Sequence, residues 1–196
     1  MPPELHLVIA ARPNLPKIAA LWHALAEAPD LAVPVLLHTG QHHDAAMFGG
    51  HLADLGLPAP HIALGVSGGS HAALTARTMM ACETVWQDRR PALVVVAGDV
   101  DGTLAAALAA SKLGLPVAVD AIAELHWAPD AASAARLLGE GHDPAGVRAV
   151  GNTMIDMLRR SLPAARARRL PDGLVARGYG VVTLHRAANV DDGAML

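Results

Sequence analysis

Cysteine and aromatic residues are almost absent from this 196-residue chain. Cys82 is the single cysteine, which excludes an internal disulfide and any metal cluster built on several thiolates. Phe, Trp and Tyr together make up 3% of the residues, so a surface on which nucleic-acid bases stack is not expected. The formal net charge of -3 provides no basic field for a nucleic acid either. We therefore expect small ligands, and no nucleic acid, as partners.

Long hydrophobic runs are also lacking, although 53% of the residues are hydrophobic. The longest apolar runs, such as Ala92–Ala97 and Leu104–Ala110, are far shorter than the roughly 20 residues that span a bilayer. The first residues have neither the basic start nor the apolar stretch of a secretory signal peptide. These absences predict a cytoplasmic protein with no membrane partner.

Short apolar runs alternate along the chain with longer segments of helical spacing. The expected strands are Leu5–Ala10, Val33–His38, His61–Leu64, Ala92–Ala97, Val117–Val119 and Val147–Val150. The expected helices are Asn14–Ala28, Ala45–Leu55, a long helix from the N-cap Ser70 to about Arg90, Gly102–Leu113, Ala131–Gly139 and Thr153–Leu162. The fully apolar run before Gly98 is typical of a central parallel strand. Repeated strand–helix units predict an α/β fold with a doubly wound, Rossmann-like parallel sheet.

The character of the chain changes after Leu162. Residues 163–178 are basic, rich in alanine and interrupted by proline and glycine, which indicates a surface crossing or hinge. A new strand is predicted at Tyr179–Leu184, and a single strand has no sheet of its own. We expect residues 1–165 to form a Rossmann-like domain and residues 166–196 to be a hinge and the first strand of a truncated second domain.

Polar residues concentrate where the predicted strands end, which is where open α/β sheets bind their ligands. Arg12 and Lys17 follow the first strand, and cations at a helix start oppose the helix dipole, so an anion is favoured over simple solvation. Asp99 follows the central strand and either caps the next helix or takes part in acid–base chemistry. Asn152 lies in a Gly-Asn-Thr sequence that indicates a turn and N-cap, with a phosphate or sugar contact as the alternative.

The 11 histidines raise the question of a metal site. Four potential ligands are close in sequence: His38, His42, His43 and Asp44. They span a strand end and a loop, and neither a His-Glu-x-x-His pattern nor a cysteine pair is present, so no metal is expected. A Gly-x-Ser-x-Gly nucleophile motif is also missing. His185 and Arg186 follow the last predicted strand, where an arginine beside a histidine offers a bidentate grip on phosphate.

Six short segments stand in a set order along the chain. They are Ala11-Arg12-Pro13-Asn14-Leu15-Pro16-Lys17, Thr39-Gly40-Gln41-His42, Leu74-Thr75-Ala76-Arg77, Gly98-Asp99, Gly151-Asn152-Thr153-Met154-Ile155-Asp156, and Thr183-Leu184-His185-Arg186 with Asn189. Taken together, they resemble the non-hydrolysing UDP-N-acetylglucosamine 2-epimerases. The resemblance implies two Rossmann-like domains in the arrangement of GT-B glycosyltransferases, with the UDP-sugar between them, no cofactor and a homodimer. This chain would supply the first half of that arrangement.

The resemblance also implies a reaction that inverts the sugar at C2. In the family, UDP is eliminated to leave a glycal with a C1–C2 double bond, and UDP adds back after reprotonation on the opposite face. Matching positions assign catalytic roles to Asp99, His185 and Lys17, and substrate binding to Arg12, Arg186, Asn189 and Asn152. The matching positions Gln41, His42 and Arg77 are associated with a second, regulatory UDP-sugar site in bacterial members. Arg77 has a simpler interpretation as a solvated residue of a helix.

The chain departs from the family between Val119 and Trp127. There the family carries a further stretch with a Glu-Ala-Gly-Leu-Arg motif and a Pro-Glu-Glu-x-Asn-Arg motif, and both are absent here. These motifs hold two catalytic glutamates, and Glu124 matches neither. The usual His-Gly-Asp-Thr motif is replaced by Ala-Gly-Asp-Val at residues 97–100, and the second domain is missing. The sequence therefore predicts a poor or inactive epimerase.

Three interpretations of this pattern stay open. The chain is a fragment or incompletely recorded copy of an active epimerase, a non-catalytic module that binds a nucleotide sugar, or a hydrolysing relative that releases UDP and a free sugar. We favour the first, because the break falls inside an otherwise intact order of motifs.

Overall fold

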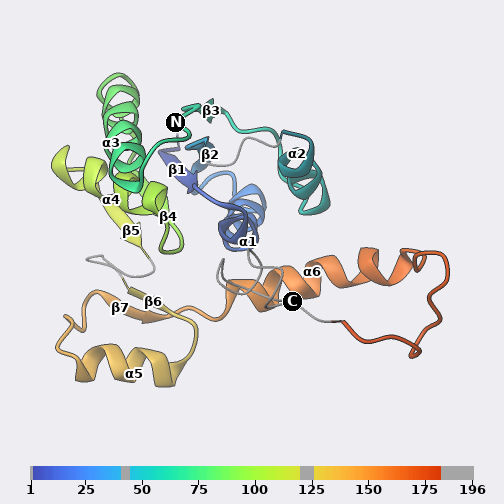
Figure 1. Cartoon of the computed structure of the whole chain (residues 1–196). Coiled ribbons are helices and arrows are strands. Elements are labelled where there is room, and N and C mark those ends of the chain that lie inside the picture. Colours follow the sequence, from blue (N-terminus) through green and yellow to red (C-terminus); the bar gives the residue numbers. More distant parts are fainter. Residues whose placement is uncertain (1, 41–44, 120–125, 182–196) are drawn as a thin grey trace. The chain divides into compact units, whose positions relative to one another are not determined.

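The computed structural model describes residues 2–40, 45–119 and 126–181 (Figure 1). By its internal contacts the chain divides into two units, residues 1–161 and residues 162–196. Each unit is described by itself. Within the described residues, no helix is long and apolar enough to cross a membrane.

The first unit is built on a five-stranded parallel sheet with the order β3-β2-β1-β4-β5. Its strands are β1 (Glu4–Ile9), β2 (Val33–His38), β3 (Ile62–Ala63), β4 (Leu93–Val96) and β5 (Val117–Val119). Strand β1 lies at the centre, with Glu4 opposite Val33 on one side and Leu5 opposite Leu93 on the other. This order confirms the predicted doubly wound α/β sheet.

Helices cover both faces of this sheet (Figure 1). The first turn is the 3-10 helix η1 (Arg12–Asn14), and the helices are α1 (Leu15–Ala26), α2 (Ala45–Asp54), α3 (His71–Asp88) and α4 (Asp101–Lys112). Successive strand residues point to opposite faces. Leu7 and Ile9 therefore share a core cluster with α1 and α2, whereas Val8 shares another with α3 and α4.

The elements predicted for the five-stranded sheet and its helices agree with the structure to within a few residues at their ends. Ser70 caps α3 as predicted, because its Oγ accepts a hydrogen bond from the Ala73 N–H at 3.3 Å. The first helix differs more: residues 12–14 form the separate turn η1, and α1 begins only at Leu15.

A second, two-stranded parallel sheet follows the first. It pairs β6 (His126–Ala128) with β7 (Val147–Ala149), and α5 (Ala131–Gly139) connects them. The sequence analysis missed β6 and placed the strand near Val147 in the main series. A crossover that returns a chain to pair parallel with the preceding strand takes about a dozen residues or more. Only residues 120–125 separate β5 from β6, so this link is too short for a helical crossover.

The last helix, α6 (Thr153–Ala167), is longer than predicted. The predicted surface crossing or hinge began at Pro163, but Pro163 lies inside α6. Residues 168–181 form no strand. The sequence analysis predicted a strand at Tyr179–Leu184. Its first three residues do not form one, and the other three lie outside the described part of the chain.

A polar network at the amino end of β1 extends from the buried His6 and Trp86 to the partly exposed Glu4 and Arg89. The His6 side chain is fully buried, and its Nδ1 accepts a hydrogen bond from Trp86 Nε1 at 3.0 Å. Because Nδ1 accepts, Nε2 carries the proton and faces Glu4 Oε2 at 3.4 Å. Arg89 donates to both Glu4 carboxylate oxygens, at 2.7 and 2.8 Å. Burial lowers the pKa of His6, and the Arg89 hydrogen bonds lower the pKa of Glu4.

Candidate functional site

The strand order reverses between β1 and β4, because β2 lies on one side of β1 and β4 on the other. The carboxyl ends of these two strands therefore form the crevice in which open α/β sheets bind ligands. The turn after β1 carries Ala11 to Asn14, and the turn after β4 carries Gly98 and Asp99. Two of the sequence-predicted regions thus meet at one edge of the sheet.

Asn14 joins these two turns. Its side chain is buried, with 3% exposed, and its Oδ1 accepts a hydrogen bond from the Ala11 N–H at 2.7 Å. Gly98 has a positive φ of 90°, and a Cβ there would collide with Asn14 Nδ2. Glycine at position 98 is therefore required both by its backbone conformation and by the close approach of Asn14.

Helix α4 begins against the ends of β1 and β2. A Cβ at Gly102 would lie 2.8 Å from the Ala10 Cβ and 3.1 Å from Thr39 Oγ1. The Thr103 hydroxyl donates to the Ala97 carbonyl at 3.1 Å and fixes the first turn of the helix to the end of β4. The positive end of the α4 dipole therefore lies at the same edge as Asp99. Thr39 Oγ1 is buried and has no hydrogen-bond partner among the described residues.

Asp99 lies between β4 and α4 and is exposed. It does not cap α4, since the N-cap residue is Val100, which makes no side-chain cap. The neighbouring carboxylate of Asp101 accepts a hydrogen bond from His71 Nδ1 at 2.6 Å, which joins the first residues of α3 and α4. This bond to Asp101 raises the pKa of His71.

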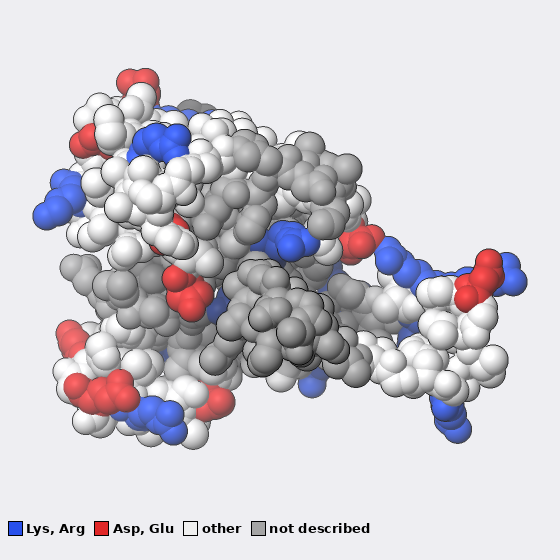
Figure 2. Space-filling model, in the orientation of Figure 1, with Lys and Arg blue, Asp and Glu red and all other residues white. Residues whose placement is uncertain are grey.

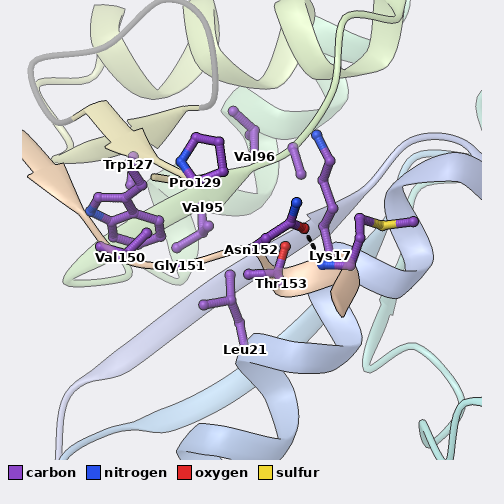
Figure 3. Close-up of a pocket in the computed structure, with 13 residues that line it drawn as sticks. Lys17, Leu21, Val95, Val96, Trp127, Pro129, Val150, Gly151, Asn152 and Thr153 are labelled. Carbon is purple, nitrogen blue, oxygen red and sulfur yellow. Dashed lines mark hydrogen bonds between the residues drawn. The ribbon is translucent and has the colours of Figure 1, made fainter. Parts of the chain in front are cut away.

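Lys17 and Asn152 line a common cavity of about 280 Å³. Figure 3 shows Lys17 on α1 facing the start of α6, where Asn152 and Thr153 lie. Asn152 Oδ1 accepts the Met154 N–H at 2.9 Å, so Asn152 caps α6, as the favoured interpretation of this turn predicted. The rest of the wall is mainly apolar, with Leu21, Val95 and Trp127 among its residues. One charged and one amide side chain thus line the same, mainly apolar cavity.

Arg12 does not share this cavity with Lys17. It lines a separate cavity of about 630 Å³ between the turn after β1 and the end of α2, together with His51, Asp54 and Val100. Arg12 lies in the 3-10 turn η1, whereas Lys17, five positions later, lies in the α-helix α1. The sequence analysis had taken the two cations together as favouring an anion.

Arg77 holds the glycine-rich loop before α3. Its guanidinium donates to the carbonyls of Ser67, at 2.9 Å, and Gly68, and to that of Ala73 at 3.3 Å. A regulatory role would have to coexist with these loop contacts. The other predicted site residues, Gln41, His42, His185, Arg186 and Asn189, lie outside the described residues.

The sequence analysis did not identify Asn14, Thr39 or Gly102 as residues that shape the site. Asn14 appeared there only as part of a motif. The available signals were a glycine directly after Asp101 and an asparagine directly after Pro13. Neither signal identifies a partner more than 60 positions away, yet Asn14 contacts Gly98 and Gly102 contacts Thr39. On the face drawn in Figure 2, the described basic and acidic side chains are interspersed and form no continuous basic area.

The order of the main sheet and its ligand-binding edge define a Rossmann-like domain of the GT-B kind. The solved structure of Methanocaldococcus jannaschii UDP-GlcNAc 2-epimerase in complex with UDP-GlcNAc and UDP is similar, with a TM-score of 0.77 and 28% identity. The match covers 84% of this chain and 51% of that one. A lipopolysaccharide outer core galactosyltransferase shares the fold alone, with a TM-score of 0.54 and 13% identity.

A family profile described as UDP-N-acetylglucosamine 2-epimerase matches residues 23–119 and 117–196, and the chain belongs to this family. A Pseudomonas aeruginosa relative, UDP-2,3-diacetamido-2,3-dideoxy-D-glucuronate 2-epimerase, is 34% identical over 209 residues. UDP-N-acetylglucosamine 2-epimerase from Methanococcus maripaludis is 28% identical over 215 residues. These alignments cover 94% and 96% of this chain, which spans 58% of the length of each relative.

Both comparisons indicate a gap inside this chain. The alignments of 209 and 215 residues are longer than the whole chain of 196, so they pass over relative residues that have no counterpart here. The two profile matches meet at residues 117–119, at the end of β5. The stretch that the sequence analysis found missing begins at this same point.

Proposed function

We propose that this chain supplies the first domain of a non-hydrolysing UDP-N-acetylglucosamine 2-epimerase, which interconverts UDP-GlcNAc and UDP-ManNAc. One observation carries the proposal: in a member of this family, the turns after β1 and β4 are interlocked through Asn14 and Gly98, and they present Asp99 at the ligand-binding edge. The exposed carboxylate is accessible to a sugar that enters from solvent.

The chemistry that this edge has to perform is a proton transfer coupled to loss of a leaving group. A base removes the proton from C2, the C1–O bond to UDP breaks, and the electron pair of the C2–H bond forms the C1–C2 double bond. Reprotonation of C2 on the opposite face and addition of UDP to C1 complete the exchange. Asp99 is our candidate for proton transfer, and Lys17 with the start of α6 for the leaving diphosphate. His185 is a second catalytic candidate, and Arg12, Asn152, Arg186 and Asn189 are candidates for substrate binding.

The experiment is incubation of the purified chain with UDP-GlcNAc in D2O, with the sugar followed by NMR. Deuterium at C2 together with the manno epimer would establish the epimerase reaction in this chain, and no change at all would leave a fragment or a binding module. Asp99→Asn should abolish the exchange, whereas Asp88→Asn, at the end of α3, should leave it unchanged. Release of UDP and free sugar without deuterium would instead show the hydrolysing relative.

A non-catalytic nucleotide-sugar-binding module is the second candidate, and the gap after β5 favours it. It predicts that UDP-GlcNAc binds, as seen by saturation-transfer NMR, while C2 shows no exchange. The sugar is tested in the same way, since UDP-2,3-diacetamido-2,3-dideoxy-D-glucuronate is the substrate in the name of the Pseudomonas aeruginosa relative. Preference for this uronate would assign its sugar to this chain. A homodimer, regulation through Gln41, His42 and Arg77, and cytoplasmic polysaccharide biosynthesis belong to the same proposal.

A further inference from the structure

A histidine and an aspartate connect the first turns of two neighbouring helices. His71 is the first residue of α3 and Asp101 is the first residue of α4, and the two helices pack against each other (Figure 1). Each helix follows a strand of the parallel sheet, so both helices begin at the edge where the strands end. The His71–Asp101 pair therefore lies at the edge where open α/β sheets bind their ligands.

The bond between the two side chains fixes the state of the imidazole. His71 Nδ1 lies 2.6 Å from Asp101 Oδ2, and because a carboxylate only accepts, Nδ1 donates. Nε2 is therefore the nitrogen that gains or loses a proton. The His71 side chain is 93% exposed, so a ligand can approach it. An imidazole oriented by a carboxylate, with its second nitrogen accessible, is the arrangement of a general acid–base group.

The backbone that carries this pair is held in place. The Ser70 hydroxyl caps α3 immediately before His71, and Arg77 donates to two carbonyls of the loop before this cap. On the other helix, the Thr103 hydroxyl donates to the end of β4, two positions after Asp101. A side chain on a fixed backbone that is also bonded at one ring nitrogen has little freedom, and proton transfer requires such fixed geometry.

The proposed reaction needs two proton-transfer groups at this edge. The proton leaves C2 from one face of the sugar and a proton arrives on the opposite face, and one side chain does not lie on both faces at once. Asp99 is two positions before Asp101, so their Cα atoms are at most about 7 Å apart. The His71 imidazole is bonded to Asp101 and is therefore within reach of a sugar that contacts Asp99.

We propose that His71, oriented by Asp101, is the second acid–base group of this site and acts on the face of C2 opposite Asp99. The Asp99 carboxylate takes the C2 proton as the C1–O bond to UDP breaks, and the C2–H electron pair forms the C1–C2 double bond. The His71 imidazolium then gives its Nε2 proton to C2, where the electron pair of the double bond accepts it, and a UDP oxygen bonds to C1.

Proton exchange with water returns the Asp99 carboxyl and the His71 imidazole to their starting states, and the reverse reaction uses them in exchanged roles. Asp101 does not touch the sugar and is a positioning residue. This inference rests on the proposed function, because it assigns a further role in the same reaction.

The first test is whether the sugar contacts His71. The NMR signals of the histidine rings are followed while UDP-GlcNAc is added to the purified chain, and His71→Gln assigns the His71 signal. We expect a saturable shift of His71 Nε2 with UDP-GlcNAc and not with UDP, since C2 belongs to the sugar. The His142 ring, which contacts the His126 ring at the start of β6, is the control and should not shift.

The outcomes separate this inference from the proposed function. If other signals shift with UDP-GlcNAc while His71 does not, or if UDP alone shifts His71 equally, the role of His71 is overturned and the proposed function stands. If no signal shifts, the proposed function fails and the role of His71 fails with it.

The second test is the rate of deuterium incorporation at C2. His71→Gln should lower it by about 100-fold or more with little change in KM, whereas the control His142→Gln should not lower it. Asp101→Asn removes the carboxylate that raises the pKa of His71, so the loss of rate at high pH should begin at a lower pH. Undiminished exchange in His71→Gln would overturn the proposal. In a chain that binds UDP-GlcNAc without exchange, the first test decides.

Discussion

The two ends of strand β1 use polar residues in opposite ways. At the amino end, His6, Glu4, Trp86 and Arg89 bond to one another, and His6 is fully buried. At the carboxyl end, Asn14 packs closely against Gly98, and the next residue, Asp99, is exposed. Nearby, Thr39 Oγ1 is buried without a hydrogen-bond partner among the described residues.

The difference shows how one strand serves both stability and function. Polar groups that satisfy one another inside the protein stabilise it, because breaking one bond leaves a buried group unpaired. Polar groups that remain open at a strand end contribute less to stability and are available to a ligand. We therefore expect substitutions at the amino end to act on stability and those of exposed side chains at the carboxyl end to act on binding or chemistry.

The largest expected effect is that of Trp86→Ala. It removes a fully buried side chain and leaves His6 Nδ1 without its donor, so the free energy of unfolding should fall by about 3–5 kcal/mol. Urea unfolding followed by circular dichroism measures it. Trp86→Phe retains most of the volume and should lose about 1–3 kcal/mol through the unpaired acceptor alone. Asp99→Ala, at the opposite end, should change stability by less than about 0.5 kcal/mol. Equal losses for Trp86→Ala and Asp99→Ala would refute the contrast.

The carboxyl end has one position where stability should respond, namely Gly98. Gly98→Ala places a Cβ against Asn14 at a positive φ, and we expect a loss of about 2–4 kcal/mol from the left-handed backbone and the overpacking together. Gly114→Ala is the matched control, since its φ is also positive but the space around it is open. It should lose only about 1–2 kcal/mol, the backbone contribution. If both substitutions lower the free energy of unfolding equally, the close contact between position 98 and Asn14 does not contribute to the loss.

The amino-end network should make stability depend on pH. The pKa of His6 is lowered by burial in the folded state, so the unfolded chain binds the proton more readily. The contribution of neutral His6 is therefore complete above the ordinary histidine value of about 6.5 and is lost as the pH falls below it. Glu4 acts in the same direction at lower pH, because Arg89 lowers its pKa. Urea midpoints between about pH 7 and pH 5 should fall, and His6→Gln should flatten this part of the profile.

The smallest expected effect on stability is that of the pH-dependent pair His71–Asp101, beside the carboxyl edge of the sheet. Its dependence on pH is opposite to that of His6, because the pKa of His71 is raised. The Asp101 carboxylate raises the pKa of His71, so the contribution of this pair is present below the ordinary value and is lost as the pH rises through the raised one. The His71 side chain is 93% exposed, so the change in stability should be minor. A histidine NMR titration measures the pKa directly, and Asp101→Asn should return it to the ordinary range. A His71 pKa that does not respond to Asp101→Asn would show that the hydrogen bond does not form in solution.

The sequence by itself determined the fold class and most of the elements. Alternating apolar runs and helical spacing depend on local periodicity, so β1, β4 and the N-cap of α3 could be read without knowledge of distant partners. The order of short motifs also sufficed to indicate the family, because each motif is contiguous in the chain.

Tertiary structure alone decided which of these residues meet. Asn14 contacts Gly98, Arg77 binds the loop before α3, and Arg12 and Lys17 line different cavities. Strand pairing has the same origin: β6 pairs with β7, and the described part of β5 pairs only with β4. Side-chain direction and crossover length are properties of the folded chain in three dimensions, and spacing along the sequence does not fix them.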